Sequence, residues 1–156
     1  MSTRGGAAYA KIMRRELGRL GDQIRAYPDE AGLWRVGGQT KNSGATLALH
    51  LVGNLQHFVA ATLGASGYVR DRDAEFNERD VPREQILARI ESCKRAVPDV
   101  LEGLSDDDLA APYPGELPQP FRGYTTEEFL LHLLWHLGWH MGQIDYHRRI
   151  VAGDGG

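Results

Sequence analysis

Apolar residues recur every three or four positions along four long segments of this 156-residue chain. That spacing places apolar side chains on one face of an α-helix, whereas a half-buried strand needs strict alternation. The segments that follow it are residues 7–27, 42–63, 82–104 and 125–151. No segment has the pattern of a strand. We therefore predict an all-α fold, a four-helix bundle with long crossover loops, in which sites are built from side chains on facing helices.

Several predicted helix ends carry recognisable signals. Either residue of Asn42–Ser43 can cap the second helix with a side-chain oxygen. Asp80 is expected to cap the third helix, with Pro82 near its first turn, where a missing N–H costs nothing. Pro98 should kink the third helix or end it early. Thr125–Glu128 has the spacing of a capping box and predicts the start of the last helix.

Length and composition are those of one globular domain over residues 1–156. The chain is 42% hydrophobic and 25% charged, as soluble proteins usually are. The proline-containing stretch 105–123 is expected to be an ordered crossover, since too little chain follows it for a second core. A net charge of −3 without a basic block argues against nucleic acid as a partner. The lone Cys93, the lack of a signal-peptide pattern and the lack of a long apolar run favour a cytoplasmic protein with no membrane partner.

Histidines are concentrated on the last predicted helix, where His132, His136 and His140 follow one another at intervals of four. Residues four apart lie one above the other on a helix, so neighbouring imidazoles can share an ion. At about 100° per residue, His140 lies nearest the apolar stripe, His136 next and His132 furthest from it. The stripe consists of Leu130, Leu133, Leu137, Met141 and Ile144. The pair His136 and His140 is therefore favoured for a site in the core.

The second predicted helix supplies a further candidate ligand, His50, which flanks the apolar stripe of that helix. His57 shares this face but lies two turns further along, about 10 Å away. That is too far to join an ion whose nitrogen ligands lie at about 2.0–2.1 Å. We therefore predict a metal site formed by His50, His136 and His140.

Simpler interpretations of these residues are also open. A histidine beside an apolar stripe is more often a hydrogen-bonded core residue than a ligand, and His147 can simply interact with the helix dipole. Trp135 and Trp139 are expected to serve in packing or in a dimer interface, and not in a substrate cage. The charged run Arg70–Asp73 is expected to be a solvated loop. Cys93 is expected to be inert packing on an apolar face.

Three neutral imidazoles would leave a divalent ion its full charge and an open coordination position, as in catalytic sites. Such an ion lowers the pKa of a bound water or thiol and polarises a substrate oxygen. Thiol-transferase and hydrolase chemistry are both consistent with this arrangement. Asn54 and Gln143 are candidates to orient a ligand or substrate, or are ordinary polar groups of the helix faces. The alternative is a non-catalytic metal- or ligand-binding dimeric bundle, and a purely structural bundle would bind no stoichiometric metal.

Three stretches of the chain resemble the DinB-like (DinB/YfiT-like) metalloenzyme family. Residues 49–58, which contain His50, resemble the family's second helix with its single metal histidine. His136–Ile144 resembles the family's His-x-x-x-His-x-Gly-Gln-Ile ending, and Arg70–Phe76 resembles a charged loop of some members. The resemblance implies a four-helix bundle, often a homodimer, with a divalent metal, most often zinc or nickel, on His50, His136 and His140.

The same resemblance implies a class of reaction. Relatives with known activity include transferases and isomerases that use low-molecular-weight thiols, although many others have no known activity. The expected partners are therefore a small-molecule electrophile and a low-molecular-weight thiol. The family name refers to the induction of a gene by DNA damage and implies no binding to DNA.

Overall fold

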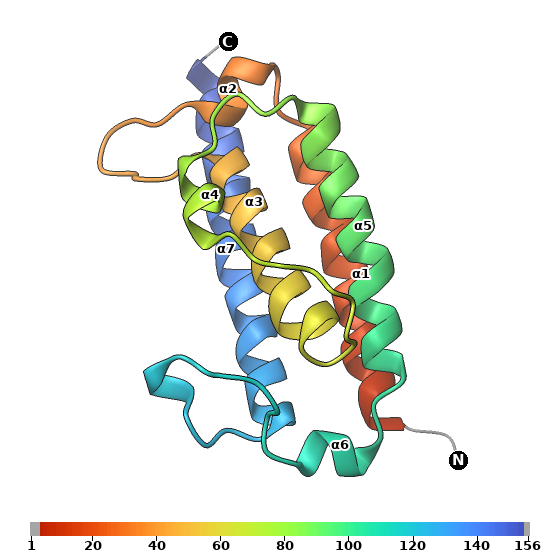
Figure 1. Cartoon of the computed structure of the whole chain (residues 1–156). Helices are drawn as coiled ribbons and strands as arrows, with labels where there is room; N and C mark the ends of the chain where they lie inside the picture. Colours follow the sequence, from red (N-terminus) through yellow and green to blue (C-terminus); the bar gives the residue numbers. More distant parts are fainter. Residues whose placement is uncertain (1–3, 155–156) are drawn as a thin grey trace.

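The computed structural model of the chain describes residues 4–154, which fold mostly into helices (Figure 1). The long helices are α1 (Arg4–Arg25), α3 (Gly44–Leu55), α5 (Arg83–Glu102) and α7 (Thr126–Asp154). Shorter helical segments lie in the connections: α2 (Glu30–Trp34), α4 (Arg72–Asn77), α6 (Asp106–Ala110) and a 3-10 turn, Gln119–Phe121. Within residues 4–154 there is no strand, only an isolated bridge between Pro112 and Thr125, so the predicted all-α fold is confirmed. No helix in this range is long and apolar enough to cross a membrane.

The four long helices lie alongside one another and bury a common core (Figure 1). α1 packs along α5, and α3 lies against both α5 and α7. The apolar stripe predicted for the last helix is buried at every position: Leu130, Leu133, Leu137, Met141 and Ile144. Every residue of α3 is also buried, so a polar side chain on this helix must find its partners inside the protein. The contact between α3 and α7 therefore brings polar groups from two distant parts of the sequence together.

The starts of α3 and α7 are those that their capping residues predict. The Ser43 side chain accepts a hydrogen bond of 3.1 Å from the backbone N–H of Thr46. The Thr125 hydroxyl accepts a hydrogen bond from the backbone N–H of Glu128, whose carboxylate accepts one from the backbone N–H of Thr125. These two caps satisfy amides that would otherwise be unpaired at the helix ends. α3 continues past Leu55 into a π-helical segment, Gln56–Ala61, which completes the second predicted helix.

The prediction that Asp80 caps the third helix is wrong. Asp80 has a φ of 57°, a left-handed conformation unlike the extended one typical of N-cap residues, and α5 begins at Arg83 with Pro82 directly before it. The fixed φ of proline prepares the chain for the first helical turn without a side-chain cap. Pro98 lies inside α5, which continues to Glu102, so this proline does not end the helix early.

Cys93 occupies the inert position predicted for it. Its side chain lies on α5 and is fully buried in the core of the protein, and burial raises the pKa of the thiol to about 12. A thiol with so high a pKa stays protonated at neutral pH and is a poor nucleophile. Cys93 therefore belongs to the packing and not to the candidate site.

Candidate metal centre

Three imidazoles meet where α3 lies against α7. His50 comes from α3, and His136 and His140 come from successive turns of α7. One nitrogen of each ring lies within 4.8 Å of a nitrogen of each of the other two. The Nε2 atoms of His50 and His136 are 3.2 Å apart. The structure therefore brings together the three histidines that the helical spacing singled out.

The spacing of these nitrogens suits a single ion. Two nitrogens bound at about 2.0–2.1 Å to one tetrahedral ion are themselves about 3.3–3.4 Å apart. The 3.2 Å between the Nε2 atoms of His50 and His136 is close to that value. Between His140 and the rings of the other two, the centroid distances are 4.6 Å and 5.3 Å. The three-histidine cluster is therefore compatible with a divalent metal.

Glu75 determines which nitrogen of His50 faces the cluster. The Nδ1 atom of His50 lies 3.0 Å from Oε1 of Glu75. An ionised carboxylate only accepts hydrogen bonds, so Nδ1 donates and Nε2 presents its lone pair to the cluster. Arg70 holds the same carboxylate with two hydrogen bonds of 2.8 Å and 2.9 Å. A buried carboxylate behind a histidine is the usual way in which proteins orient a metal ligand.

The expectation of a solvated loop at Arg70–Asp73 holds for Asp71, Arg72 and Asp73, which are exposed. It is wrong for Arg70, which is largely buried together with Glu75. Their side chains are only 12% and 6% exposed. Residues 72–77 form α4, whose first turn is capped by Asp71, and α4 packs on α3. A Cβ atom at Gly53 would overlap Oε2 of Glu75, so the missing side chain at this position lets the carboxylate approach α3. The segment 70–75 therefore holds a carboxylate against His50.

The replacement Gly53→Ala should weaken zinc binding through this close contact. The added methyl must displace Glu75, and loss of such a supporting group typically lowers metal affinity by about 10–100-fold. Competition with a chromophoric chelator measures the affinity. Gly18→Ala is a matched control, because a Cβ there meets only the end of Lys94 at 3.8 Å. Unchanged zinc affinity in the Gly53→Ala protein would show that Glu75 does not support the site.

Gln143 is hydrogen-bonded to a histidine of the cluster, whereas no hydrogen bond joins Asn54 to the cluster among the described residues. The Nδ1 atom of His140 lies 2.7 Å from Oε1 of Gln143. Donation from Nδ1–H to this oxygen leaves Nε2 of His140 free to bind. Asn54 is 7% exposed, and its Oδ1 atom has no hydrogen-bond partner within residues 4–154. Gln143 therefore orients His140, and the structure assigns no such part to Asn54.

The environment of the cluster lowers the pKa of two of its histidines, His136 and His140. Burial, with a smaller contribution from the nearby His140 and His50, lowers the pKa of His136 to about 3. Burial also lowers the pKa of His140. Burial alone would raise the pKa of Glu75, but the hydrogen bonds from His50 and Arg70 outweigh it, so the net shift is downward. At neutral pH the rings of His136 and His140 are thus in the unprotonated form that binds metals.

The low pKa of His136 predicts that the metal-free protein loses stability in mild acid. The unfolded histidine takes up a proton below about pH 6.5, whereas the folded one resists protonation down to about pH 3. The free energy of unfolding should therefore fall as the pH drops from about 6.5, by about 1 kcal/mol at pH 5 after allowance for solvent screening. Urea unfolding in the presence of a chelator measures this. His136→Gln should lose less stability over the same range, and an equal loss would contradict the assignment.

The remaining histidines lie outside the cluster. His57 packs against Phe58, with ring centroids 4.7 Å apart. The ring of His132 lies on Phe121, with centroids 4.1 Å apart. His147 is hydrogen-bonded at Nε2 to the backbone carbonyl of Arg35 and at Nδ1 to the hydroxyl of Tyr27. Both nitrogens of His147 are used inside the protein, so its part is structural.

Comparison with known protein families gives a match, which spans the residues of the cluster. The profile of the DinB superfamily matches residues 13–144, a range that contains His50, Glu75, His136 and His140. No curated protein and no solved structure matches the chain significantly. Because the matched range covers most of the chain, the chain belongs to the DinB superfamily.

Proposed function

We propose that this protein is a metalloenzyme that holds one divalent cation, zinc or nickel, between His50, His136 and His140. The observation that carries the proposal is the convergence of three imidazoles from two helices, with the lone pair of His50 aimed into the cluster by Glu75. Imidazole binds both metals well. Three protein ligands leave a coordination position open, which is characteristic of catalytic sites.

The surroundings of the cluster support a catalytic role. A divalent ion held by neutral ligands lowers the pKa of a coordinated water or thiol and polarises a substrate. Burial keeps the ring of His136 neutral. This ligand therefore adds no negative charge that would offset the charge of a bound cation. His140 and Gln143 lie at the edge of a cavity of about 870 Å³, so a small molecule can reach the cluster from that side.

The reaction class that we propose is transfer of a low-molecular-weight thiol to a small electrophile, in keeping with the family resemblance. The sulfur forms a bond to the electrophilic carbon, and the bond from that carbon to its leaving group breaks. The leaving group takes the electron pair, and the thiol proton passes to solvent. The reaction consumes no oxidant or reductant.

The test is turnover of a simple electrophile by the metal-loaded protein. Zinc- or nickel-loaded protein is mixed with L-cysteine and 1-chloro-2,4-dinitrobenzene, and formation of the S-aryl product is followed by absorbance. We expect a rate at least about tenfold above that of the metal-free protein, and loss of this excess in the His140→Ala protein. Stoichiometric metal without turnover would favour a non-catalytic metal-binding protein. Thiol-independent hydrolysis of 4-nitrophenyl acetate would instead indicate a hydrolase.

We also propose that two copies of the chain associate through the exposed side of α7. Trp135 and Trp139 are 59% and 56% exposed, and their rings stack with centroids 5.7 Å apart. Leu131, one turn earlier, is 55% exposed. Cβ atoms at Gly138 and Gly142 would meet nothing within 4 Å, so a neighbouring helix can approach closely. The same face of a second copy would cover these side chains in a twofold-symmetric interface.

Light scattering coupled to size-exclusion chromatography tests this interface. The double variant Trp135→Glu/Trp139→Glu should shift the protein from dimer to monomer, because it places four like charges in a twofold interface. Val69→Glu is a control, since Val69 is 87% exposed and lies outside α7. A wild-type protein that is monomeric at high concentration, or a double variant that stays dimeric, would contradict the proposal.

A further inference from the structure

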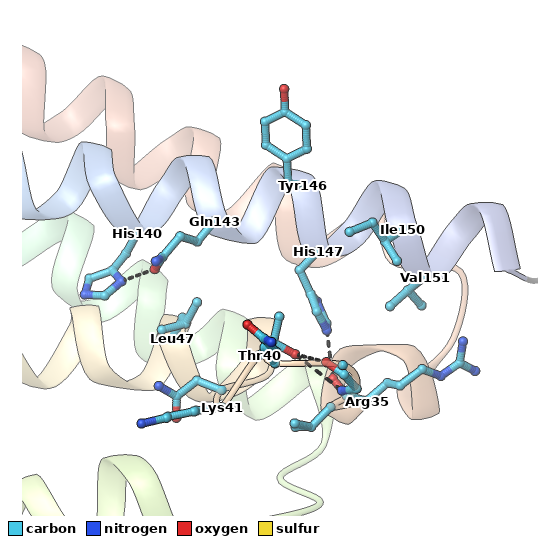
Figure 2. Close-up of a pocket in the computed structure, with 15 residues that line it drawn as sticks. Arg35, Thr40, Lys41, Leu47, His140, Gln143, Tyr146, His147, Ile150 and Val151 are labelled. Carbon is cyan, nitrogen blue, oxygen red and sulfur yellow. Dashed lines mark hydrogen bonds between the residues drawn. The ribbon is translucent and has the colours of Figure 1, made fainter.

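A large cavity begins at the histidine cluster and extends along the C-terminal half of α7. It has a volume of about 870 Å³, which is within the range of small-molecule sites. His140 and Gln143 form one end, and Ile150 and Val151 lie at the other (Figure 2). The segment 35–42, which joins α2 to α3, forms the opposite wall.

The charges in this cavity are all of one sign. Its charged lining residues are Arg35 and Lys41, and no Asp or Glu lines it. Neither cation has a salt bridge within residues 4–154. By contrast, Arg70 and Arg148, which lie elsewhere, are each paired with a carboxylate. The cavity therefore offers two unpaired cations to whatever enters it.

The two cations lie toward different ends of the cavity. In Figure 2 the side chain of Lys41 extends toward the end where His140 lies, and that of Arg35 extends toward Val151. His147 anchors this wall, because its Nε2–H donates a hydrogen bond of 2.8 Å to the backbone carbonyl of Arg35. The position of the segment relative to α7 is thus fixed at one point by a hydrogen bond.

The rest of the lining is largely apolar. Val36 and Ile150 are 51% and 59% exposed although they face a concave surface. Leu47 and Val151 add further apolar area. A ligand that matches this lining has an apolar body, which removes these side chains from water, and an anionic group, which pairs with Arg35 or Lys41.

We propose that this cavity binds a small organic acid, with its carboxylate at Arg35 or Lys41 and its reactive end toward His140. The orientation of the reactive end toward His140 rests on the proposed function. The binding of the carboxylate in the cavity does not depend on it. Either the electrophile or the thiol can supply the carboxylate. The chemistry that the cavity recognises is the same in both cases, an anionic group on an apolar body.

Binding of a matched pair of probes tests the proposal without any turnover. The probes are 4-(4-fluorophenyl)butanoate and the corresponding neutral amide, and fluorine NMR measures their dissociation constants. The carboxylate should bind the wild-type protein about tenfold more tightly than the amide. In the double variant Arg35→Gln/Lys41→Gln the two probes should bind equally. The variant Lys11→Gln/Arg95→Gln removes the same charge from α1 and α5, outside the cavity, and should keep the preference.

The His50→Ala variant separates this inference from the proposed metal site. Loss of the His50 ring should remove the metal. Because His50 does not line the cavity, the preference for the carboxylate should remain intact. A preference that disappears with His50 but survives in Arg35→Gln/Lys41→Gln would mean that the carboxylate binds the cation of the cluster, and would overturn the inference. Equal binding of the two probes to the wild-type protein would overturn it as well.

The source of the carboxylate is distinguished by the thiol-transfer assay. Cysteine and cysteamine differ by the carboxylate of the thiol, and 4-chloro-3-nitrobenzoate and 1-chloro-2-nitrobenzene differ by that of the electrophile. The partner that binds in the cavity should lose about tenfold in kcat/KM when its carboxylate is absent. The Arg35→Gln/Lys41→Gln variant should abolish that difference. A difference that the variant retains would show that the carboxylate acts elsewhere.

Discussion

Replacement of His136 by alanine is expected to reduce the bound zinc from one ion per chain to none after dialysis. His136 lies close to both other histidines, with its Nε2 atom 3.2 Å from that of His50 and its ring centroid 4.6 Å from that of His140. Its loss leaves two ligands from different helices. Since loss of a supporting group alone costs about 10–100-fold in affinity, loss of a ligand should cost more than about a hundredfold. Elemental analysis of the dialysed protein measures the zinc content.

His132→Ala is the matched control for this experiment. His132 lies one turn before His136 on the same helix, but its ring packs on Phe121 and takes no part in the cluster. The His132→Ala protein should therefore retain its zinc, whereas His50→Ala and His140→Ala should lose it. Circular dichroism shows that each variant is folded. Retention of zinc by the His136→Ala protein, or its loss from His132→Ala, would mean that the ligand set is misassigned.

The second large effect is expected for Glu75→Gln. The neutral amide leaves the buried guanidinium of Arg70 without its counter-charge, which typically costs about 3–5 kcal/mol of folding free energy. It also removes the charge that orients His50, so zinc affinity should fall by about 10–100-fold. Urea unfolding and zinc competition measure the two quantities. Glu78→Gln is the control, because Glu78 pairs with Arg89 near the surface and should contribute less than about 1 kcal/mol.

A double variant separates the two effects of Glu75. Arg70→Met/Glu75→Gln leaves no unpaired buried charge, so it should be more stable than Glu75→Gln alone. Its zinc affinity should remain low, because His50 still lacks the carboxylate. Recovery of zinc affinity together with stability would indicate that Glu75 acts only on folding. Glu75 would then have no direct part in orienting the ligand.

The fold and the histidine cluster could be predicted because both depend on a simple period. The buried stripe from Leu130 to Ile144 is set by the 3.6-residue repeat, which also ranks His140 and His136 above His132. His50 could be added because it flanks the apolar stripe of the second predicted helix in the same way. Such patterns act within a single helix, and the packing of α3 against α7 then brings the two sets of ligands together.

The support of the cluster could not be predicted from these patterns. Arg70 and Glu75 lie five residues apart in a charged stretch that looks solvated, and their burial depends on the docking of α4 onto α3. The signal that could have suggested α4 is Asp71, which caps the following turn. The need for glycine at position 53 likewise cannot be predicted from the sequence. A side chain there would collide with the carboxylate of Glu75, which lies 22 positions later in the chain.

The same reason explains the error at Asp80. An Asp two residues before a proline is a plausible cap, but the chain must turn sharply here to leave α4 and enter α5, and Asp80 adopts a φ of 57° to do so. Asp tolerates this left-handed conformation better than most residues. The geometry of a connection between two packed helices, and not local propensity, decides the conformation of such a residue.

X-ray absorption at the zinc edge of the loaded wild-type protein tests the central claim most directly. The spectrum should show three imidazole nitrogens per ion at about 2.0–2.1 Å, with one or more oxygen ligands completing the coordination. A sulfur ligand at about 2.3 Å, or a shell of oxygen atoms without imidazole scattering, would contradict the assignment of His50, His136 and His140 as the ligands.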